Sequence, residues 1–158
     1  MTLEQLFAGN AGSVLRFNAR LPTALAAAAQ AAGMELVTVD SGKARDKSAF
    51  LRASAKALHF PEYFGQNWDA FYDCIADRAQ SAGKGEVIVF EELSGFARTE
   101  PEEFATAVDA LRDAAEFWVE QSKRLIVLIG LDQPLLAPEL PELTGSSSTT
   151  GTGRGRPA

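Results

Sequence analysis

Cysteine and histidine are almost missing from this sequence, which holds one of each, Cys74 and His59, in 158 residues. One cysteine cannot form a disulfide within the chain. No zinc-ligand spacing, P-loop or glycine-rich dinucleotide motif is present, so we expect no metal and no cofactor. Cys74 falls in a predicted helix without a positioned base, which favours a small buried residue over a nucleophile.

Long apolar runs are missing as well. No segment reaches the roughly 18 consecutive apolar residues of a membrane-spanning helix. Residues 1–10 lack the basic start and the apolar run of a signal peptide. We therefore expect no membrane partner, and a reducing cytoplasm is the simplest location.

Positive charge is in deficit, with 15 Lys and Arg against 21 Asp and Glu and a net charge of −6. Nucleic acid binding needs a basic surface, which this composition disfavours, whereas a basic protein is a suitable partner. We expect such a protein partner, no direct binding of nucleic acid and no small-molecule substrate. The length, with 46% hydrophobic residues, fits one domain with an adequate core.

One window lacks Lys and Arg altogether. Residues 60–77 hold four acids instead, Glu62, Asp69, Asp73 and Asp77. The last three are four residues apart, so a helix stacks them on one face, where each like-charge pair costs about 0.2–0.5 kcal/mol. The pattern leaves two interpretations open, a solvated acidic face and a surface that binds cations.

The hydrophobic pattern predicts an α/β domain, in which strands and helices alternate around a parallel sheet. Apolar and β-branched runs predict strands. They cover residues 13–17, 35–40, 86–90 and 124–129. Helical periodicity, with proline and N-cap signals, predicts helices at residues 21–32, 46–58, 67–80 and 101–121. After Gly130, prolines and then a Gly/Ser/Thr-rich stretch predict a flexible tail.

The acidic window also contains a recognisable signature. Residues 61–74 read PEYFGQNWDAFYDC. This run resembles the signature of the barstar family, the inhibitors of barnase-type ribonucleases, which reads Pro-Glu-Tyr-Tyr-Gly-x-Asn-x-Asp-Ala-Leu-aromatic-Asp-Cys. The resemblance covers about residues 35–130 and implies a barstar-like α/β domain with a small three-stranded parallel sheet packed with helices.

The rest of the chain lies outside that resemblance. Residues 1–34 form an N-terminal extension with a possible strand and helix, and residues 131–158 form the flexible tail. The extension adds to the sheet, covers an edge or makes a second interface, and the sequence does not choose among these.

The resemblance implies a stoichiometric inhibitor that is not an enzyme. The acidic helix and the loop before it block the RNA-binding cleft of a ribonuclease, where carboxylates pair with the cations that hold phosphate. Asp73 matches the central acidic anchor of the family and Asp69 the second acid. Tyr63 matches a loop aromatic that packs on the catalytic histidine of the target. Tyr72 keeps an aromatic group at the interface.

Three further features bear on the expected interface. Asp77 adds a negative charge to the expected interface, and Arg78 adds a cation on or near its rim, where it would repel a basic nuclease. The family also supplies an acid from its last helix, which is Asp113 or Glu116 in this chain.

Two alternatives therefore stay open. The first is a barstar-fold binding or immunity module for a basic partner that is not a ribonuclease, motivated by Arg78, a longer last helix and the N-terminal extension. The second is an enzyme that uses Asp69 and Asp73 as paired carboxylates or a Cys74–His59 dyad. It is disfavoured because further ligands and a third orienting group are not evident.

Overall fold

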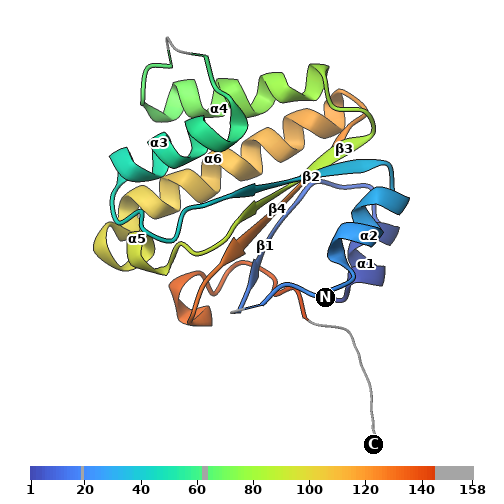
Figure 1. Cartoon of the computed structure of the whole chain (residues 1–158), viewed down its shortest axis with the longest axis horizontal. Helices are drawn as coiled ribbons and strands as arrows, with labels where there is room; N and C mark the ends of the chain where they lie inside the picture. Colours follow the sequence, from blue (N-terminus) through green and yellow to red (C-terminus); the bar gives the residue numbers. More distant parts are fainter. Residues whose placement is uncertain (19, 62–63, 145–158) are drawn as a thin grey trace, which may run out of the picture.

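The computed structural model describes residues 1–18, 20–61 and 64–144, and they form a parallel four-stranded sheet in the order β1-β4-β3-β2 (Figure 1). The strands are β1 (Ser13–Phe17), β2 (Met34–Val39), β3 (Gly85–Phe90) and β4 (Arg124–Gly130). The central strands β3 and β4 are almost wholly buried. Their continuous apolar runs follow from this position, because both faces of a central parallel strand are covered.

The helices cover both faces of the sheet (Figure 1). Those on one face are α3 (Lys47–Leu58), α4 (Trp68–Asp77), α5 (Ser94–Thr99) and α6 (Pro101–Glu120). Those on the other face are α1 (Leu3–Ala8) and α2 (Leu25–Ala31). Short 3-10 turns, η1 (Arg78–Gln80) and η2 (Pro134–Leu136), follow α4 and β4. No helix of the described residues is long and apolar enough to span a membrane.

The expected three-stranded sheet is wrong by one strand. The fourth strand, β1, comes from the N-terminal extension and pairs in parallel with β4, with Leu15 opposite Leu128. The same extension supplies α1 and α2, whose buried Leu6 and Leu25 pack on the second face of the sheet. The extension therefore adds to the sheet and covers a face that the other helices leave open.

Residues 131–144, expected as the start of a flexible tail, pack against the domain. Ala137, Leu140 and Leu143 are buried. Arg16 N–H donates to the Pro141 carbonyl at 3.0 Å, and Leu143 N–H donates to the Arg16 carbonyl at 2.8 Å. This segment therefore shields part of the outer edge of β1, and buried leucines hold it there. Residues 145–158 lie outside the described part of the chain.

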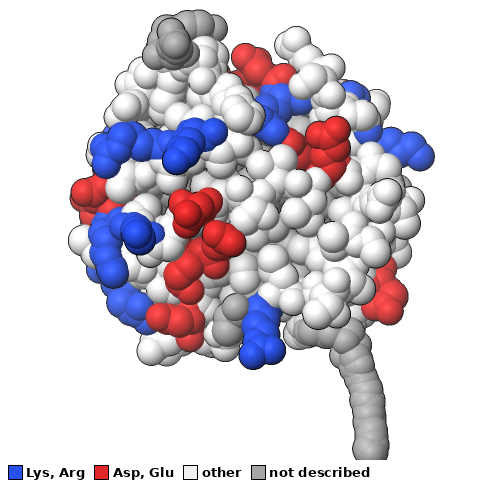
Figure 2. Space-filling view, in the orientation of Figure 1, with Lys and Arg blue, Asp and Glu red and all other residues white. Residues whose placement is uncertain are grey.

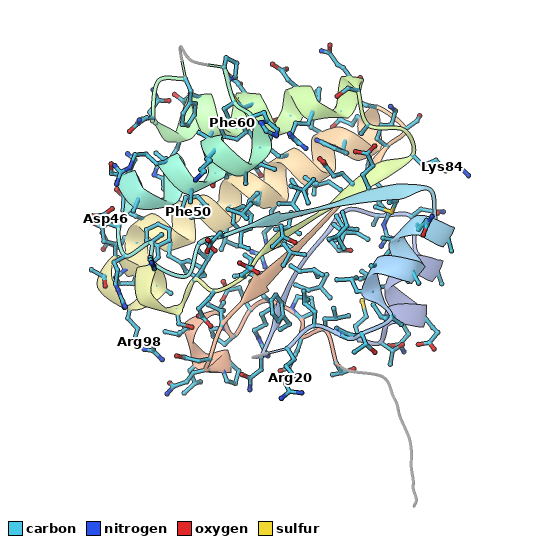
Figure 3. The ribbon with its side chains drawn as sticks, in the orientation of Figure 1. Arg20, Asp46, Phe50, Phe60, Lys84 and Arg98 are labelled. Atoms are coloured by element: carbon cyan, nitrogen blue, oxygen red, sulfur yellow. The ribbon has the colours of Figure 1, made fainter. Side chains whose placement is uncertain are left out.

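An aromatic cluster packs the acidic helix α4 against α3, β3 and α5. Phe50 of α3, labelled in Figure 3, lies with its ring centroid 5.9 Å from Trp68, 5.4 Å from Phe71, 5.3 Å from Phe90 and 5.1 Å from Phe96. Aromatic pairs at such separations add to the energy of burial alone. The cluster fixes the first turn of α4 on α3 and on the end of β3.

Candidate protein-binding groove

An open groove of about 800 Å³ runs between α4 and α6. The two helices pack on the same face of the sheet (Figure 1). Its lining consists mainly of acidic, aromatic and small side chains: Trp68, Asp69, Tyr72, Asp73, Thr106, Asp109, Ala110, Asp113, Glu116, Phe117 and Glu120. The groove therefore joins the predicted acidic helix to the last helix of the domain.

The geometry of α4 follows from its sequence. The Asn67 side chain accepts a hydrogen bond from Ala70 N–H at 2.8 Å and caps the helix, as the sequence predicts. Phe71 and Ile75 are fully buried, and helical spacing then turns Asp69 and Asp73 outward, where both are exposed. Asp69 also lies in the first turn, where the helix dipole favours an anion.

Two tryptophans tie α4 to α6. The indole Nε1 of Trp118, on α6, donates to the Ile75 carbonyl at 3.0 Å within the core. The indole Nε1 of Trp68, on α4, donates to Glu103 Oε1 at 3.0 Å. The two bonds lie at opposite ends of the contact between these helices. They hold the two walls of the groove at a fixed separation before any partner arrives.

The acids of α6 follow one face of that helix. Asp109, Asp113, Glu116 and Glu120 succeed one another at intervals of four, three and four residues, which is the spacing of a single helical face. The opposite face is buried through apolar side chains such as Phe104, Leu111 and Trp118, none more than 4% exposed. The burial of that face directs the acids into the groove.

The groove carries six carboxylates, from Asp69, Asp73, Asp109, Asp113, Glu116 and Glu120, and the described residues that line it include no Lys or Arg. The ion pairs of the described residues lie elsewhere, between Arg16 and Glu142, Arg78 and Glu86, and Arg98 and Asp132. The negative charge of this surface is therefore not neutralised from within the described structure.

The pKa of Tyr72 is affected by this negative charge. Burial raises the pKa of its phenol, and the nearby carboxylates of Asp113, Asp73 and Glu120 raise it further. The side chain is half-buried in the groove, between acids that belong to both helices. Tyr72 therefore presents a protonated hydroxyl and an aromatic ring among carboxylates at neutral pH.

Lysines and arginines gather elsewhere. On the left of Figure 2 they lie over the side that carries α3 and α5. Exposed cations of that side include Arg45, Arg52, Lys56 and Arg98. Lys47 of α3 lies with Nζ 5.6 Å from the centre of the Trp68 ring. The cations of that side lie among exposed acids such as Asp46 and Asp132, whereas the described lining of the groove contains no cation.

The structure brings together most of the predicted binding residues. Asp69, Tyr72, Asp73 and Glu116 line the groove. Asp113 lines it as well, so the two candidate acids of the last helix face the same space. Asp77 is exposed and ends α4, and it is not among the residues that line the groove. Tyr63 lies outside the described residues.

The expectation that Arg78 presents a cation on the rim is wrong. Its Nε donates to Glu86 Oε1 at 2.8 Å, Nη2 donates to Glu86 Oε2, and Nη1 donates to the Leu58 carbonyl at 2.8 Å. Glu86 is buried at the start of β3. Arg78 turns toward the sheet because this buried carboxylate would otherwise lack a partner.

Sequence analysis missed two acids of the groove, Asp109 and Glu120. Their spacing from Asp113 and Glu116 is visible in the sequence and places all four on one helical face. That spacing does not show that the face is turned toward α4. The pairing of the two helices depends on contacts such as that between Trp118 and Ile75.

Other candidate sites have less support. Cys74 is half-buried, and burial raises the pKa of its thiol, with Asp77 and Asp73 adding to the effect, so the thiolate that a nucleophile needs is disfavoured. His59 ends α3 in a left-handed conformation with a φ of 55°. The described residues contain no group of three or more His, Cys, Asp or Glu side chains placed to hold a metal ion.

Comparison with known proteins gives one family. The family model described as Barstar (barnase inhibitor) matches residues 34–130. The matched region runs from β2 to the end of β4 and includes both walls of the groove. The strand β1 and the helices α1 and α2 precede it. A search of curated proteins found no match to the chain.

Proposed function

The chain belongs to the barstar (barnase inhibitor) family, and from this membership we propose that it is a stoichiometric protein inhibitor of a barnase-like ribonuclease. In this proposal α4 and the loop before it enter the RNA-binding cleft of the enzyme. The facing side of α6 contributes a second row of acids. The inhibitor works by occupying the cleft and needs no chemical step of its own.

The main structural support for this proposal is the groove between α4 and α6. It places six carboxylates in one open space, and the described lining residues supply no cation. Like charges on one helical face cost free energy, so this arrangement weakens the free protein slightly. A partner with a cationic surface removes that cost and gains charge-assisted hydrogen bonds.

The chemistry of a ribonuclease cleft fits such a groove. A cleft that binds RNA must present cations to the phosphates, since phosphate contacts dominate nucleic acid affinity. A carboxylate offers a guanidinium fork two oxygens in much the same way as a phosphate does. The groove therefore imitates the charge of the substrate backbone. Opposed potentials also speed the encounter of the two proteins.

Individual residues receive distinct roles in the proposal. Asp73, which faces α6 across the groove, is the central anchor among the phosphate-binding cations of the enzyme, and Asp69 is the second acid. Tyr72 packs its ring on the enzyme and offers its hydroxyl. Tyr63, which precedes α4 in the sequence, packs on the catalytic histidine of the enzyme. Asp77, at the end of α4, extends the negative potential past the groove.

One of the arguments for a basic partner that is not a ribonuclease no longer holds. It drew on Arg78 as a cation that would repel a nuclease, and this side chain is instead paired with Glu86. The acidic lining of the groove supports a cationic partner of either kind. The family supplies the ribonuclease, and for that reason we prefer it.

A titration of the full chain into a barnase-type ribonuclease assay tests the proposal. We expect activity to fall linearly to zero at one inhibitor per enzyme. Asp73→Ala should weaken inhibition roughly tenfold or more, because it removes charge-assisted hydrogen bonds. The control is Asp40→Ala, which makes the same change in net charge at an exposed residue that follows β2 and does not line the groove.

Two results would overturn the proposal. One is full enzyme activity at every ratio of inhibitor to enzyme. The other is equal weakening by Asp73→Ala and Asp40→Ala, which would show that net charge alone acts and that the groove has no special part.

A further inference from the structure

A second hollow adjoins the groove on the far side of α6. It has a volume of about 310 Å³ and lies between α6 and the start of β1. Glu116 lines both spaces, so the groove and the second hollow meet at this residue of α6. The second hollow combines a helix of the matched family region with a strand of the N-terminal extension.

Gly12 brings the extension this close to α6. A Cβ atom at this position would lie 2.7 Å from Ala115 Cβ and 2.8 Å from the Ala115 carbonyl oxygen, which is closer than real contacts allow. The missing side chain lets the backbone lie directly on α6. As a result the strand that follows begins beside Arg112 and Glu116.

The outer edge of β1 is only partly paired. Arg16 points its N–H and C=O away from β4 and bonds to Pro141 and Leu143. Because successive residues of a strand alternate in direction, Val14 also points its backbone groups away from β4. Among the described residues neither group of Val14 has a hydrogen-bond partner, and Val14 lines the second hollow.

We propose that the second hollow binds an extended segment of the ribonuclease partner, which adds to the sheet edge at Val14. The inference rests on the proposed function, since it widens the interface of the same inhibitor. Addition of a strand to an open edge gives affinity through main-chain hydrogen bonds. The segment at Pro141–Leu143 already occupies the rest of this edge, so the added segment is short.

Continuity with the groove argues for the same partner in both spaces. An enzyme seated on Asp73 and Glu116 meets the second hollow next, because Glu116 stands at the boundary of the two. The second hollow differs in charge, since Arg112 lines it beside Glu116. The inserted segment therefore carries a polar or acidic side chain toward Arg112, unlike the cations that enter the groove.

Amide hydrogen exchange of the full chain, with and without a barnase-type ribonuclease, tests the inference. We expect exchange of the Val14 amide to slow by roughly tenfold or more in the complex, because a new hydrogen bond protects it. The Arg16 amide, bonded to Pro141 in the free protein, should change little. An unchanged Val14 amide in a complex that Asp73→Ala weakens would overturn the inference and leave the inhibitor function intact.

A substitution gives an independent measurement. Of the backbone hydrogen-bonding groups, Val14→Pro removes only an outward N–H and none of the bonds between β1 and β4, and proline is tolerated on edge strands. It also replaces the buried valine side chain. Val14→Ala keeps the N–H while losing packing, so it is the matched control. We expect Val14→Pro to inhibit roughly three- to tenfold less well than Val14→Ala.

The remaining outcomes also decide the matter. Equal inhibition by Val14→Pro and Val14→Ala would contradict the inference. Protection of the Val14 amide that rises with protein concentration and needs no ribonuclease would assign the edge to a second copy of the chain. If the ribonuclease does not bind at all, the proposed function fails and the partner named here fails with it.

Discussion

Arg78 forks onto Glu86, with Nε on Oε1 at 2.8 Å and Nη2 on Oε2, and its third nitrogen reaches the Leu58 carbonyl. The guanidinium thereby joins the end of α4 to β3 and to the end of α3. Glu86 is 4% exposed, so among the described residues its charge depends on Arg78. Arg78 directly follows the acidic helix in the sequence, but its charge is used to pair with a buried carboxylate of the core.

Removal of this cation should destabilise the fold. Arg78→Ala leaves a buried carboxylate without its partner, and we expect a loss of about 3 kcal/mol in the free energy of unfolding. Urea denaturation measures the change. Arg98→Ala is the control, because it breaks the exposed pair with Asp132 and should change the free energy of unfolding far less. Equal losses in the two variants would contradict this account of Arg78.

The same residue should matter little for affinity. Since Arg78 points away from the groove, Arg78→Gln, which removes the positive charge, should inhibit the ribonuclease as well as the natural chain does when inhibition is expressed per folded protein. A cation on the rim would behave differently, because removing its charge would relieve repulsion and tighten binding. Tighter binding by Arg78→Gln than by an Arg98→Gln control would restore the earlier interpretation.

The pKa of Tyr72 should depend on the opposite wall of the groove. Asp113→Asn removes one of the charges that raise it, so the pKa of Tyr72 should fall toward its ordinary value of about 10. The chain has only two tyrosines, so an ultraviolet titration in a Tyr63→Phe background reports Tyr72 alone. An identical titration curve with and without Asp113 would show that the carboxylate does not reach the ring.

The sign of the linked stability follows from the same shift. The folded state holds the Tyr72 proton more tightly than the unfolded state, because the pKa is raised on folding. Its contribution is therefore complete below the ordinary tyrosine pKa and is lost as the pH rises through the raised value. Tyr72→Phe should flatten this alkaline loss of stability.

The acids of α6 should govern the salt dependence of binding. Asp113→Asn and Glu116→Gln each remove one charge from the groove, so each should weaken association about two- to fivefold at low salt. The difference from the natural chain should shrink as salt rises, since screening reduces the contribution of exposed charges. Surface plasmon resonance over a range of salt concentrations measures this. Penalties that stay constant with salt would exclude an electrostatic role.

The cap of α4 should support both stability and binding. Asn67→Ala removes the hydrogen bond to Ala70 N–H and should cost about 1 kcal/mol in the free energy of unfolding. Asn67→Asp keeps a cap and should keep most of that stability. Thermal unfolding of the three proteins tests the order. If alanine and aspartate were equally destabilising, the cap would not be the cause.

The parts of the fold that the sequence predicts are those with a local signal. The apolar runs of β3 and β4 identify buried strands, and Asn67 identifies the start of α4. The helix α1 was missed although Thr2 and Gln5 form a capping box, which is a pattern that sequence alone displays. The prolines after Gly130 led us to predict a flexible tail from that point. In the structure Leu140 and Leu143 are buried instead.

The other parts depend on contacts between distant segments. Nothing local to Arg78 shows that Glu86 will be its partner, because their contact follows from the return of the chain into β3. Likewise the acids of α4 and α6 become one groove only when Trp118 reaches Ile75. The signature at residues 61–74 identified one wall, and the family resemblance pointed to Asp113 or Glu116 on the last helix. The three-dimensional packing added Asp109 and Glu120 and showed that the two rows face one space.

Competition on the enzyme shows whether the groove takes the place of RNA phosphates. A short oligonucleotide and the full chain are bound together to a barnase-type ribonuclease, and the affinity of the chain is measured at rising oligonucleotide concentration. We expect strict competition, in which the apparent dissociation constant of the chain rises in proportion to the oligonucleotide concentration, because the groove and the phosphates occupy the same cleft. A ternary complex, or an affinity that the oligonucleotide does not change, would contradict it.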